Sequence, residues 1–341
     1  MRDKREELRG KRIIFLQAAH TAVDERVRYH QARTLEESGH TVEVYGLDSF
    51  SSFALKQADI YIVDTPKALW KVRRNSAQIV YDITEWYPSK KNLRNIRLGK
   101  CIKAFILLLA NIWAGCRANA FIFGEVDKAR PFRLLFPRKK HIFLPYYPDL
   151  QYISARTPRS ITKECRLLYA GPLTAEKGWY RVLQTVKEVA LLRTDLQITL
   201  DVITRDSISS DTMPENVHIH SYPYMPFEEF CQQITNYDIF LDLRDNDYEN
   251  TRCMPIKIFY YAACGRPSIY TRLRAISKGF PEVEQCATLV EDSTAAVHAI
   301  LEYIDNTEHY AKHCQNAQQL ARNTYNWNNI KDSFLQLIDE L

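Results

Sequence analysis

The chain contains little glycine, only 10 of its 341 residues. A dinucleotide-binding loop of the usual kind needs several glycines close together, so that the backbone can approach a pyrophosphate. This scarcity argues against a glycine-lined nucleotide cradle. The charge is also nearly balanced, with 46 basic and 41 acidic residues and a net charge of +5. That excess suits an anionic substrate or an anionic membrane face, and it is too small to predict nucleic-acid binding.

The eight cysteines are scattered, and none forms a Cys-x-x-Cys pair or sits with histidines at zinc spacing. We therefore expect reduced, mostly buried thiols in a cytoplasmic protein. Residues 1–7 are charged and have no apolar core, so they do not resemble a signal peptide. The longest apolar stretch, residues 102–114, is shorter than the roughly 20 residues that cross a bilayer.

The order of apolar and amphipathic segments predicts two α/β halves with parallel sheets. Prolines and polar residues between 145 and 164 indicate a linker between them. We expect an N-terminal domain over 1–150, a C-terminal domain over 160–325 and a last helix within 328–341. The expected strands lie at 12–16, 41–45, 60–63, 79–81, 120–123, 142–144, 166–170, 198–203, 239–241, 268–270 and 289–290. The expected helices lie at 27–37, 93–117, 179–192, 227–235, 255–265 and from about 294 onward.

The segment 255–267 is the most informative motif. Pro255 suits the first helical position, Gly265 suits the left-handed position after a helix, and Pro267 prevents continuation. A helix N-terminus carries free N–H groups and a partial positive charge, to which Lys257 adds a full charge. The motif therefore predicts a phosphate site.

A second phosphate element is expected at 167–178. Gly171 ends a strand, and Lys177 and Gly178 stand directly before a helix, which is the order that a phosphate site requires. The alternative is an ordinary strand-to-helix loop with a solvated lysine.

Two loops that follow strands of the first half carry charged residues. Asp24 can cap the next helix, and Arg26 can grip an anion from the edge of a cleft. Glu85 lies among aromatic residues, which suits a hydroxyl-rich ligand because carboxylates accept hydrogen bonds from hydroxyls. The alternatives are plain capping with surface charge, and a capped loop with core aromatics.

Together these motifs resemble those of family 4 glycosyltransferases, which have the GT-B fold. Segment 255–267 is similar to Pro-x-Lys-x-x-Glu-Tyr-x-Ala-x-Gly-x-Pro, and 169–178 to Tyr-x-Gly-Arg-Leu-x-x-x-Lys-Gly. Segment 20–27 is similar to His-x-x-x-Asp-x-Arg-Val, and 81–88 to Tyr-Asp-x-His-Glu-x-x-Pro. The resemblance implies two Rossmann-like, doubly wound parallel-sheet domains that face a cleft, with the last helix joined to the N-terminal domain.

The resemblance also implies a function. The chain is expected to move a sugar from a nucleoside-diphosphate-sugar donor to a glycan or lipid-linked acceptor in cell-surface polysaccharide synthesis. Anomeric configuration is expected to be retained, and neither a metal nor another cofactor is expected. The implied site residues are Glu85, Asp24 and Arg26 as the catalytic, acceptor-side group, Gly171, Lys177, Gly178 and Lys257 at the donor diphosphate, and Glu249 and Tyr260 at the donor sugar or ribose.

Four positions depart from the family motifs. Thr84 replaces a histidine, Pro172 replaces an arginine, and Arg252 and Tyr260 replace two glutamates. These changes leave open a second interpretation, a degenerate and non-catalytic GT-B protein that binds a glycan or a partner transferase.

Residues 90–114 combine a basic part with an apolar part. Such a segment can rest on the inner face of an anionic membrane, and many family members act on lipid-linked acceptors. A core helix with a solvated basic start is the alternative.

Overall fold

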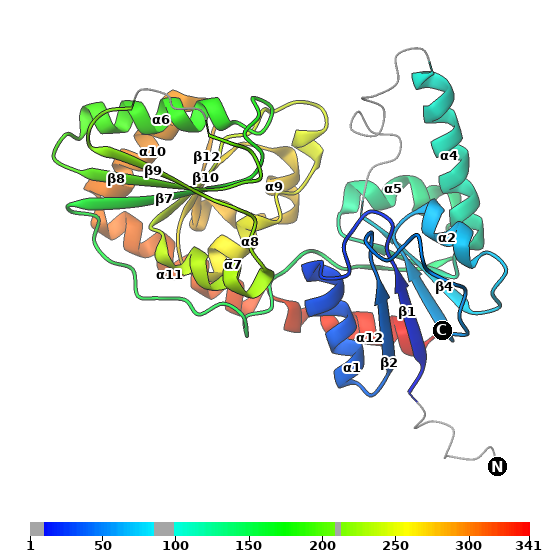
Figure 1. Ribbon diagram of the computed structural model, residues 1–341. Helices are drawn as coiled ribbons and strands as arrows, with labels where there is room; N and C mark the ends of the chain where they lie inside the picture. Colours follow the sequence, from blue (N-terminus) through cyan, green and yellow to red (C-terminus); the bar gives the residue numbers. More distant parts are fainter. Residues whose placement is uncertain (1–9, 85–98, 209–212) are drawn as a thin grey trace. The chain divides into compact units, whose positions relative to one another are not determined.

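The computed structural model describes residues 10–84, 99–208 and 213–341 (Figure 1). Its contacts divide the chain into two compact units. The first comprises Met1–Tyr146 and Trp327–Leu341, and the second comprises Tyr147–Asn326. Each unit contains one six-stranded sheet with helices beside it.

All neighbouring strands of the first sheet are parallel, in the order β2-β1-β3-β4-β5-β6. The strand order reverses between β1 and β3, which makes this pair the topological switch point. Apolar runs buried on both faces, such as Ile13 to Leu16, explain the central position of β1. The strands are β1 (Arg12–Leu16), β2 (Thr41–Tyr45), β3 (Ile60–Val63), β4 (Gln78–Ile83), β5 (Ala120–Phe123) and β6 (Lys140–Phe143).

The helices of the first unit differ from the sequence prediction in three places. The helix expected at 27–37 begins as a π-helix, and two short helices were not expected, one of which contains Pro131. An internal proline ordinarily argues against a helix, which explains that omission. The helices are η1 (Glu25–Ala32), α1 (Arg33–Glu37), α2 (Pro66–Val72), α4 (Lys100–Arg117), α5 (Val126–Leu135), η5 (Trp327–Asn329) and α12 (Lys331–Asp339).

The end of the chain belongs to the first unit. The side chains of Trp327, Phe334 and Ile338 join the same buried cluster as those of Ile13 and Phe15 in β1. The Trp327 indole N–H donates to Thr34 Oγ1 at 2.8 Å, and Lys11 Nζ donates to the Ile338 carbonyl at 2.7 Å. Residues more than 290 positions apart in sequence therefore share one core.

The second sheet is also parallel throughout, in the order β12-β11-β10-β7-β8-β9. Its switch point lies between β7 and β10, the arrangement of a dinucleotide-binding Rossmann sheet. Only β9 was not expected from the sequence. The strands are β7 (Glu164–Ala170), β8 (Gln197–Ile203), β9 (Val217–Tyr222), β10 (Ile239–Asp242), β11 (Ser268–Thr271) and β12 (Ala287–Val290).

Helices cover both faces of the second sheet, with α6 and α10 together on one face and α8 with α11 on the other (Figure 1). Helix α6 has the predicted bounds, whereas α8 begins at Lys257, after Pro255. Gly265 takes the predicted left-handed conformation with φ of 68°. The helices are α6 (Trp179–Leu192), α7 (Phe227–Gln233), η2 (Ile234–Asn236), η3 (Asn250–Arg252), α8 (Lys257–Ala263), α9 (Arg274–Gly279), η4 (Val283–Gln285), α10 (Ser293–Asp305) and α11 (Thr307–Asn323). The two doubly wound parallel sheets confirm the predicted α/β class.

Candidate functional site

The loops that follow β7 and β10 meet at the switch point of the second sheet. The carboxyl ends of parallel strands share one edge, and ligands of open α/β sheets bind there. The Asp245 backbone N–H donates to the Glu176 carbonyl at 3.0 Å and joins the two loops. These loops contain four predicted site residues, Gly171, Lys177, Gly178 and Glu249.

Gly178 allows the two loops to approach closely. Its φ is +80°, which L side chains rarely adopt, and a Cβ atom at this position would lie 2.0 Å from the Leu243 carbonyl oxygen. A glycine is therefore required here for both conformation and space, directly before α6 begins.

The first turn of α6 has no capping side chain. The backbone N–H groups of Lys177 and Trp179 both donate to the Thr174 carbonyl, at 3.1 and 3.2 Å, which shapes the turn that enters the helix. The end of this 14-residue helix keeps its partial positive charge, because no carboxylate caps it. Such an end favours a bound anion.

Lys177 adds a full charge beside this helix end. Its Nζ donates to Asn250 Oδ1 at 3.0 Å and lies 3.5 Å from Glu176 Oε1, with about a third of the side chain exposed. Asn250 in turn is placed by Asp247, whose Oδ1 accepts the backbone N–H groups of Glu249 and Asn250, each at 2.8 Å. The neutral Asn250 amide orients the ammonium group, whereas the Glu176 carboxylate offsets part of its charge.

Neighbouring carboxylates have arginine partners. Asp242 pairs with Arg244, and Asp245 pairs with Arg181. Burial opposes the charge on Arg244, but the Asp242 carboxylate outweighs that effect and raises the pKa of the guanidinium. These pairs limit the negative charge that the two aspartates present to an anion near Lys177.

Gly171 and Tyr169 hold the loop after β7 in place. The Gly171 N–H donates to the Ile203 carbonyl at 3.0 Å. The Tyr169 hydroxyl donates to the Pro172 carbonyl at 2.7 Å and to the Lys177 carbonyl at 3.2 Å. Burial raises the pKa of Tyr169, so the hydroxyl keeps the proton that it donates.

The other predicted donor-side residues occupy different settings. Lys257 is half-buried at the start of α8, and Glu249 is half-buried in the loop beside Asn250. Tyr260 is only 2% exposed, and its ring packs edge-on against Phe227 of α7 with a centroid distance of 6.0 Å. This burial differs from the expected ribose contact, which needs an accessible hydroxyl.

Arg252 occupies the position where the family motif has its first glutamate. Its guanidinium stacks on the Tyr248 ring at 3.8 Å and donates to the Tyr248 carbonyl at 2.9 Å. The side chain is thus held by its own turn.

In the first unit, Asp24 caps the helix after β1. Its Oδ1 accepts the backbone N–H groups of Arg26 and Val27 at 3.1 and 3.4 Å. Its Oδ2 lies 3.3 Å from His20 Nδ1, and His20 Nε2 lies 3.1 Å from Thr84 Oγ1. Burial lowers the pKa of His20, but the Asp24 carboxylate outweighs this effect and the net shift is upward. Asp24 thus holds an imidazole beside Thr84, where the family motif has histidine.

The sequence predicts that Arg26 lies at the edge of a cleft, but the structure does not place it on an open edge. It is 2% exposed, and its Nη2 lies 2.8 Å from Asp82 Oδ1 in a buried ion pair. The guanidinium also stacks on the Tyr146 ring at 4.4 Å, and Gln31 donates to the other Asp82 oxygen at 3.0 Å. The arginine holds the loop to β4 and is a positioning residue.

The predicted residue Glu85 and the basic residues 90–98 lie outside the described residues. Within the described ranges, no group of three or more His, Cys, Asp or Glu side chains is arranged to hold a metal ion. The expectation of a metal-independent reaction stays a prediction. In the same part of the chain, no helix is long and apolar enough to cross a membrane, α4 included.

Asn250 and Asp247 are not among the site residues that the sequence predicts. An aspartate followed by two turn residues and an asparagine is a local signal for an Asx-type turn at 247–250. The contact of Asn250 with Lys177 spans 73 positions, so no local pattern indicates it.

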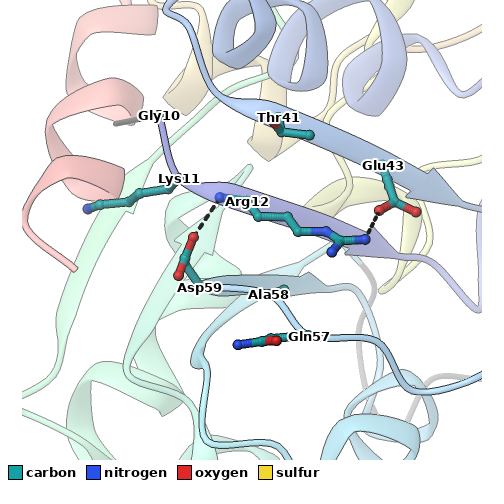
Figure 2. A pocket seen from close by; sticks show the side chains of 8 residues that line it. All are labelled: Gly10, Lys11, Arg12, Thr41, Glu43, Gln57, Ala58 and Asp59. Atoms are coloured by element: carbon teal, nitrogen blue, oxygen red, sulfur yellow. Dashed lines mark hydrogen bonds and ion pairs between the residues drawn. The ribbon is translucent and has the colours of Figure 1, made fainter. Parts of the chain in front are cut away.

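A separate hollow of about 610 Å³ lies at the amino edge of the first sheet (Figure 2). Arg12 crosses it, and its side chain is paired with Glu43 at 2.7 Å while its backbone N–H donates to Asp59 at 2.7 Å. This edge is opposite the carboxyl ends of the strands, so the topology does not favour it as a ligand site.

Residues 193–336 match the model of a family described as glycosyl transferase-like. No curated protein sequence matches the chain.

Several solved structures share its fold. Sucrose-phosphate synthase from Thermosynechococcus elongatus is similar with a TM-score of 0.70 at 13% identity, over 96% of this chain and 98% of that one. HepE from Anabaena in complex with UDP-glucose is similar with a TM-score of 0.67 at 13% identity, over 97% and 100%. The pneumococcal O-GlcNAc transferase GtfA in complex with UDP and GlcNAc is similar with a TM-score of 0.59 at 12% identity, over 87% of this chain and 60% of that one. The chain therefore has the GT-B fold, and its residues 193–336 are similar to a glycosyl transferase-like family.

Proposed function

We propose that the chain is a family 4-like glycosyltransferase that moves a sugar from a nucleoside-diphosphate donor to a glycan or lipid-linked acceptor. The observation that carries the proposal is the uncapped amino end of α6 beside Lys177, at the switch point of a Rossmann-type sheet. A diphosphate satisfies both features, because it supplies acceptors for backbone N–H groups and charge for the ammonium. HepE, which shares the fold, was solved with UDP-glucose.

On the donor side, we assign the diphosphate to Gly171, Lys177, Gly178 and Lys257. We assign the charge that develops on the departing diphosphate to Lys177, to the end of α6 and, by resemblance, to Lys257. Glu249 is our candidate for the donor sugar, because it adjoins Asn250 in the same turn. Tyr260 remains our candidate for the ribose because of the resemblance, although its side chain is buried.

On the acceptor side, we assign Asp24 and Glu85 to substrate contact and Arg26 to positioning. The reaction is proposed to retain configuration, to need no metal and to serve cell-surface polysaccharide synthesis, as the resemblance implies. A cytoplasmic location at the inner membrane face fits the free thiols and the segment 90–114, whose described part exposes apolar side chains on α4.

Lys177→Ala tests the donor site. We expect the turnover of sugar transfer to fall by roughly 100-fold or more, since a preorganised charge on the leaving diphosphate is lost. Lys187→Ala is the matched control, because Lys187 is an exposed lysine on α6 itself. A purified transfer assay with a thermal melt for each variant gives the answer, and turnover that matches the control would refute the assignment.

The burial of Tyr260 and the stacking of Arg252 on Tyr248 favour a second candidate, a non-catalytic GT-B subunit that binds a glycan or a partner transferase. Both positions carry glutamates in the family motif. Calorimetric titration with a panel of nucleoside diphosphates separates the two candidates. Micromolar binding that Lys177→Ala weakens supports the transferase, whereas no binding by the folded protein supports the subunit.

A further inference from the structure

A groove of about 760 Å³ opens at the switch point of the first sheet. This volume lies within the roughly 300–1,000 Å³ of typical small-molecule sites. The loop after β1 and helices α2 and α4 form it, and α2 packs beside α4 (Figure 1). Its lining includes Ala18, Ala19, Trp70, Ile106, Leu109 and Trp113.

The groove offers few hydrogen-bond partners to a sugar. The Thr65 hydroxyl already accepts the Ala68 N–H at 3.1 Å, as the cap of α2. The Ala18 and Ala19 N–H groups already donate to the buried Asp64 carboxylate, each at 2.8 Å. The two tryptophan rings lie 5.4 Å apart, which leaves a mainly aromatic and aliphatic lining. An apolar occupant suits this lining better than a glycan.

Helix α4 continues the apolar surface outside the groove. Ile102 is 67% exposed, Phe105 60% and Ile106 57%. In Figure 1 the amino-terminal half of α4 extends beyond the sheet of the first unit. An apolar chain that leaves the groove along α4 would meet these exposed apolar side chains.

The two helices carry charge of one sign. Neither α2 nor α4 contains an aspartate or glutamate, so the charges on their side chains come from lysine and arginine. Lys67 lines the groove and is exposed, and Lys103 lies one helical turn before Leu107, which also lines it. Positive charge at the rim complements an anionic headgroup.

We propose that this groove binds the apolar chain of an anionic lipid, with the phosphate of the headgroup at Lys67. The proposal that this lipid is also the acceptor of the reaction rests on the proposed function. The proposal that the lipid binds in the groove does not depend on it. The groove begins at Ala18 and Ala19, directly before His20, and Ala19 is five positions before Asp24. A headgroup sugar carried on that phosphate would thus lie near the acceptor-side loop.

Dodecyl phosphate, used below its micelle concentration, is the probe. Calorimetry on the whole protein is expected to show binding of dodecyl phosphate. Inorganic phosphate is expected to bind far more weakly, because it has no alkyl chain. Ile106→Glu places a carboxylate in the apolar lining and is expected to weaken binding by about tenfold or more. Leu192→Glu is the matched control, since Leu192 is 64% exposed on α6 of the second unit, and it is expected to change nothing.

Ala110→Phe supplies a second variant, which fills the groove without adding charge. It should also weaken dodecyl phosphate binding, and circular dichroism melts establish that each variant is folded. Equal affinity of wild type, Ile106→Glu and Ala110→Phe would overturn the proposal. Binding to phosphatidylglycerol vesicles but not to dodecyl phosphate would also overturn it, and would assign α4 to membrane docking alone.

A second copy of the chain is the other occupant to test. Light scattering that shows a dimer in wild type and a monomer in Ile106→Glu would assign the groove to self-association and overturn the proposal. Nucleoside diphosphate titrations on the same samples keep the two proposals separate. If the wild-type protein binds nucleoside diphosphate but not dodecyl phosphate, only the groove proposal is contradicted. If it binds dodecyl phosphate but no nucleoside diphosphate, only the donor-site proposal is contradicted.

Discussion

The two sheets have related topologies, but their switch points differ in electrostatics. In the second unit the helix after β7 begins without a capping side chain, and Lys177 stands beside it. In the first unit the helix after β1 is capped by Asp24, and Asp64 accepts the N–H groups of Ala18 and Ala19. One switch point leaves donors and charge for a ligand, whereas the other supplies its own carboxylates.

Together, the two proposals give one fold two kinds of ligand. The order of the strands decides where a site lies, and the loop residues decide which charge it accepts. At the first switch point the backbone N–H groups already donate to a carboxylate, and the loops border an apolar groove instead of an anion site. The second is suited to a diphosphate.

Arg26→Ala is expected to have the largest effect on stability, because it leaves Asp82 buried without its ion-pair partner. Breaking such a pair costs about 3–5 kcal/mol. Arg28→Ala is the control, since Arg28 pairs with Glu36 at 2.8 Å on the exposed surface. Such a pair is worth about 1 kcal/mol or less. Urea unfolding of both variants measures the contrast, and equal midpoints would show that the charges of the first switch point are not structural.

Gly178→Ala should have the next largest effect. A left-handed conformation costs a residue with a side chain about 1–2 kcal/mol, and the clash with the Leu243 carbonyl adds to that cost. We expect a loss of at least about 2 kcal/mol together with weaker nucleotide binding. Gly39→Ala is the control, because Gly39 has φ of +87° but nothing lies within 4 Å of its Cβ position. A Gly178 variant that binds nucleotide as tightly as the Gly39 variant would contradict the donor site.

The last expected effect, which vanishes near neutral pH, concerns acid stability. Burial, together with the positive charge of Arg26, lowers the pKa of His30 to about 3. Between pH 6.5 and 3 the unfolded chain therefore binds more protons, so stability falls as the pH falls through this range, by up to about 1.4 kcal/mol per pH unit.

His30→Phe should flatten this dependence in urea unfolding at a series of pH values. The phenyl ring can keep the stacking on Trp327, whose ring lies 5.0 Å from that of His30. Some slope should remain, because burial lowers the pKa of His313 in the second unit to about 4. An unchanged slope would show that His30 does not carry the acid sensitivity of the first unit.

Local sequence signals account for the fold class and for elements such as α6, whose start is marked by Gly178 and whose apolar face has helical spacing. They do not account for the π-helical turns of η1, because side-chain spacing does not distinguish i→i+5 from i→i+4 hydrogen bonds over eight residues. The order of strand, glycine, lysine and helix predicts that Lys177 is a phosphate-site residue. Its contact with Asn250 depends on long-range packing, so this local order does not indicate it. Arg26 was placed on an open edge because a charged side chain is ordinarily exposed, and the buried Asp82 overrides that tendency.

The position of α12 sets the order in which the protein can mature during synthesis. The strands of the first sheet leave the ribosome early, yet one face of that sheet lacks part of its cover until Trp327, Phe334 and Ile338 have emerged. The second unit, which lies between these parts in the chain, can complete its own core first. Translation from the amino end thus leaves the core of the first unit incomplete until residues 327–338 have emerged, and a truncation before Trp327 would remove part of that core.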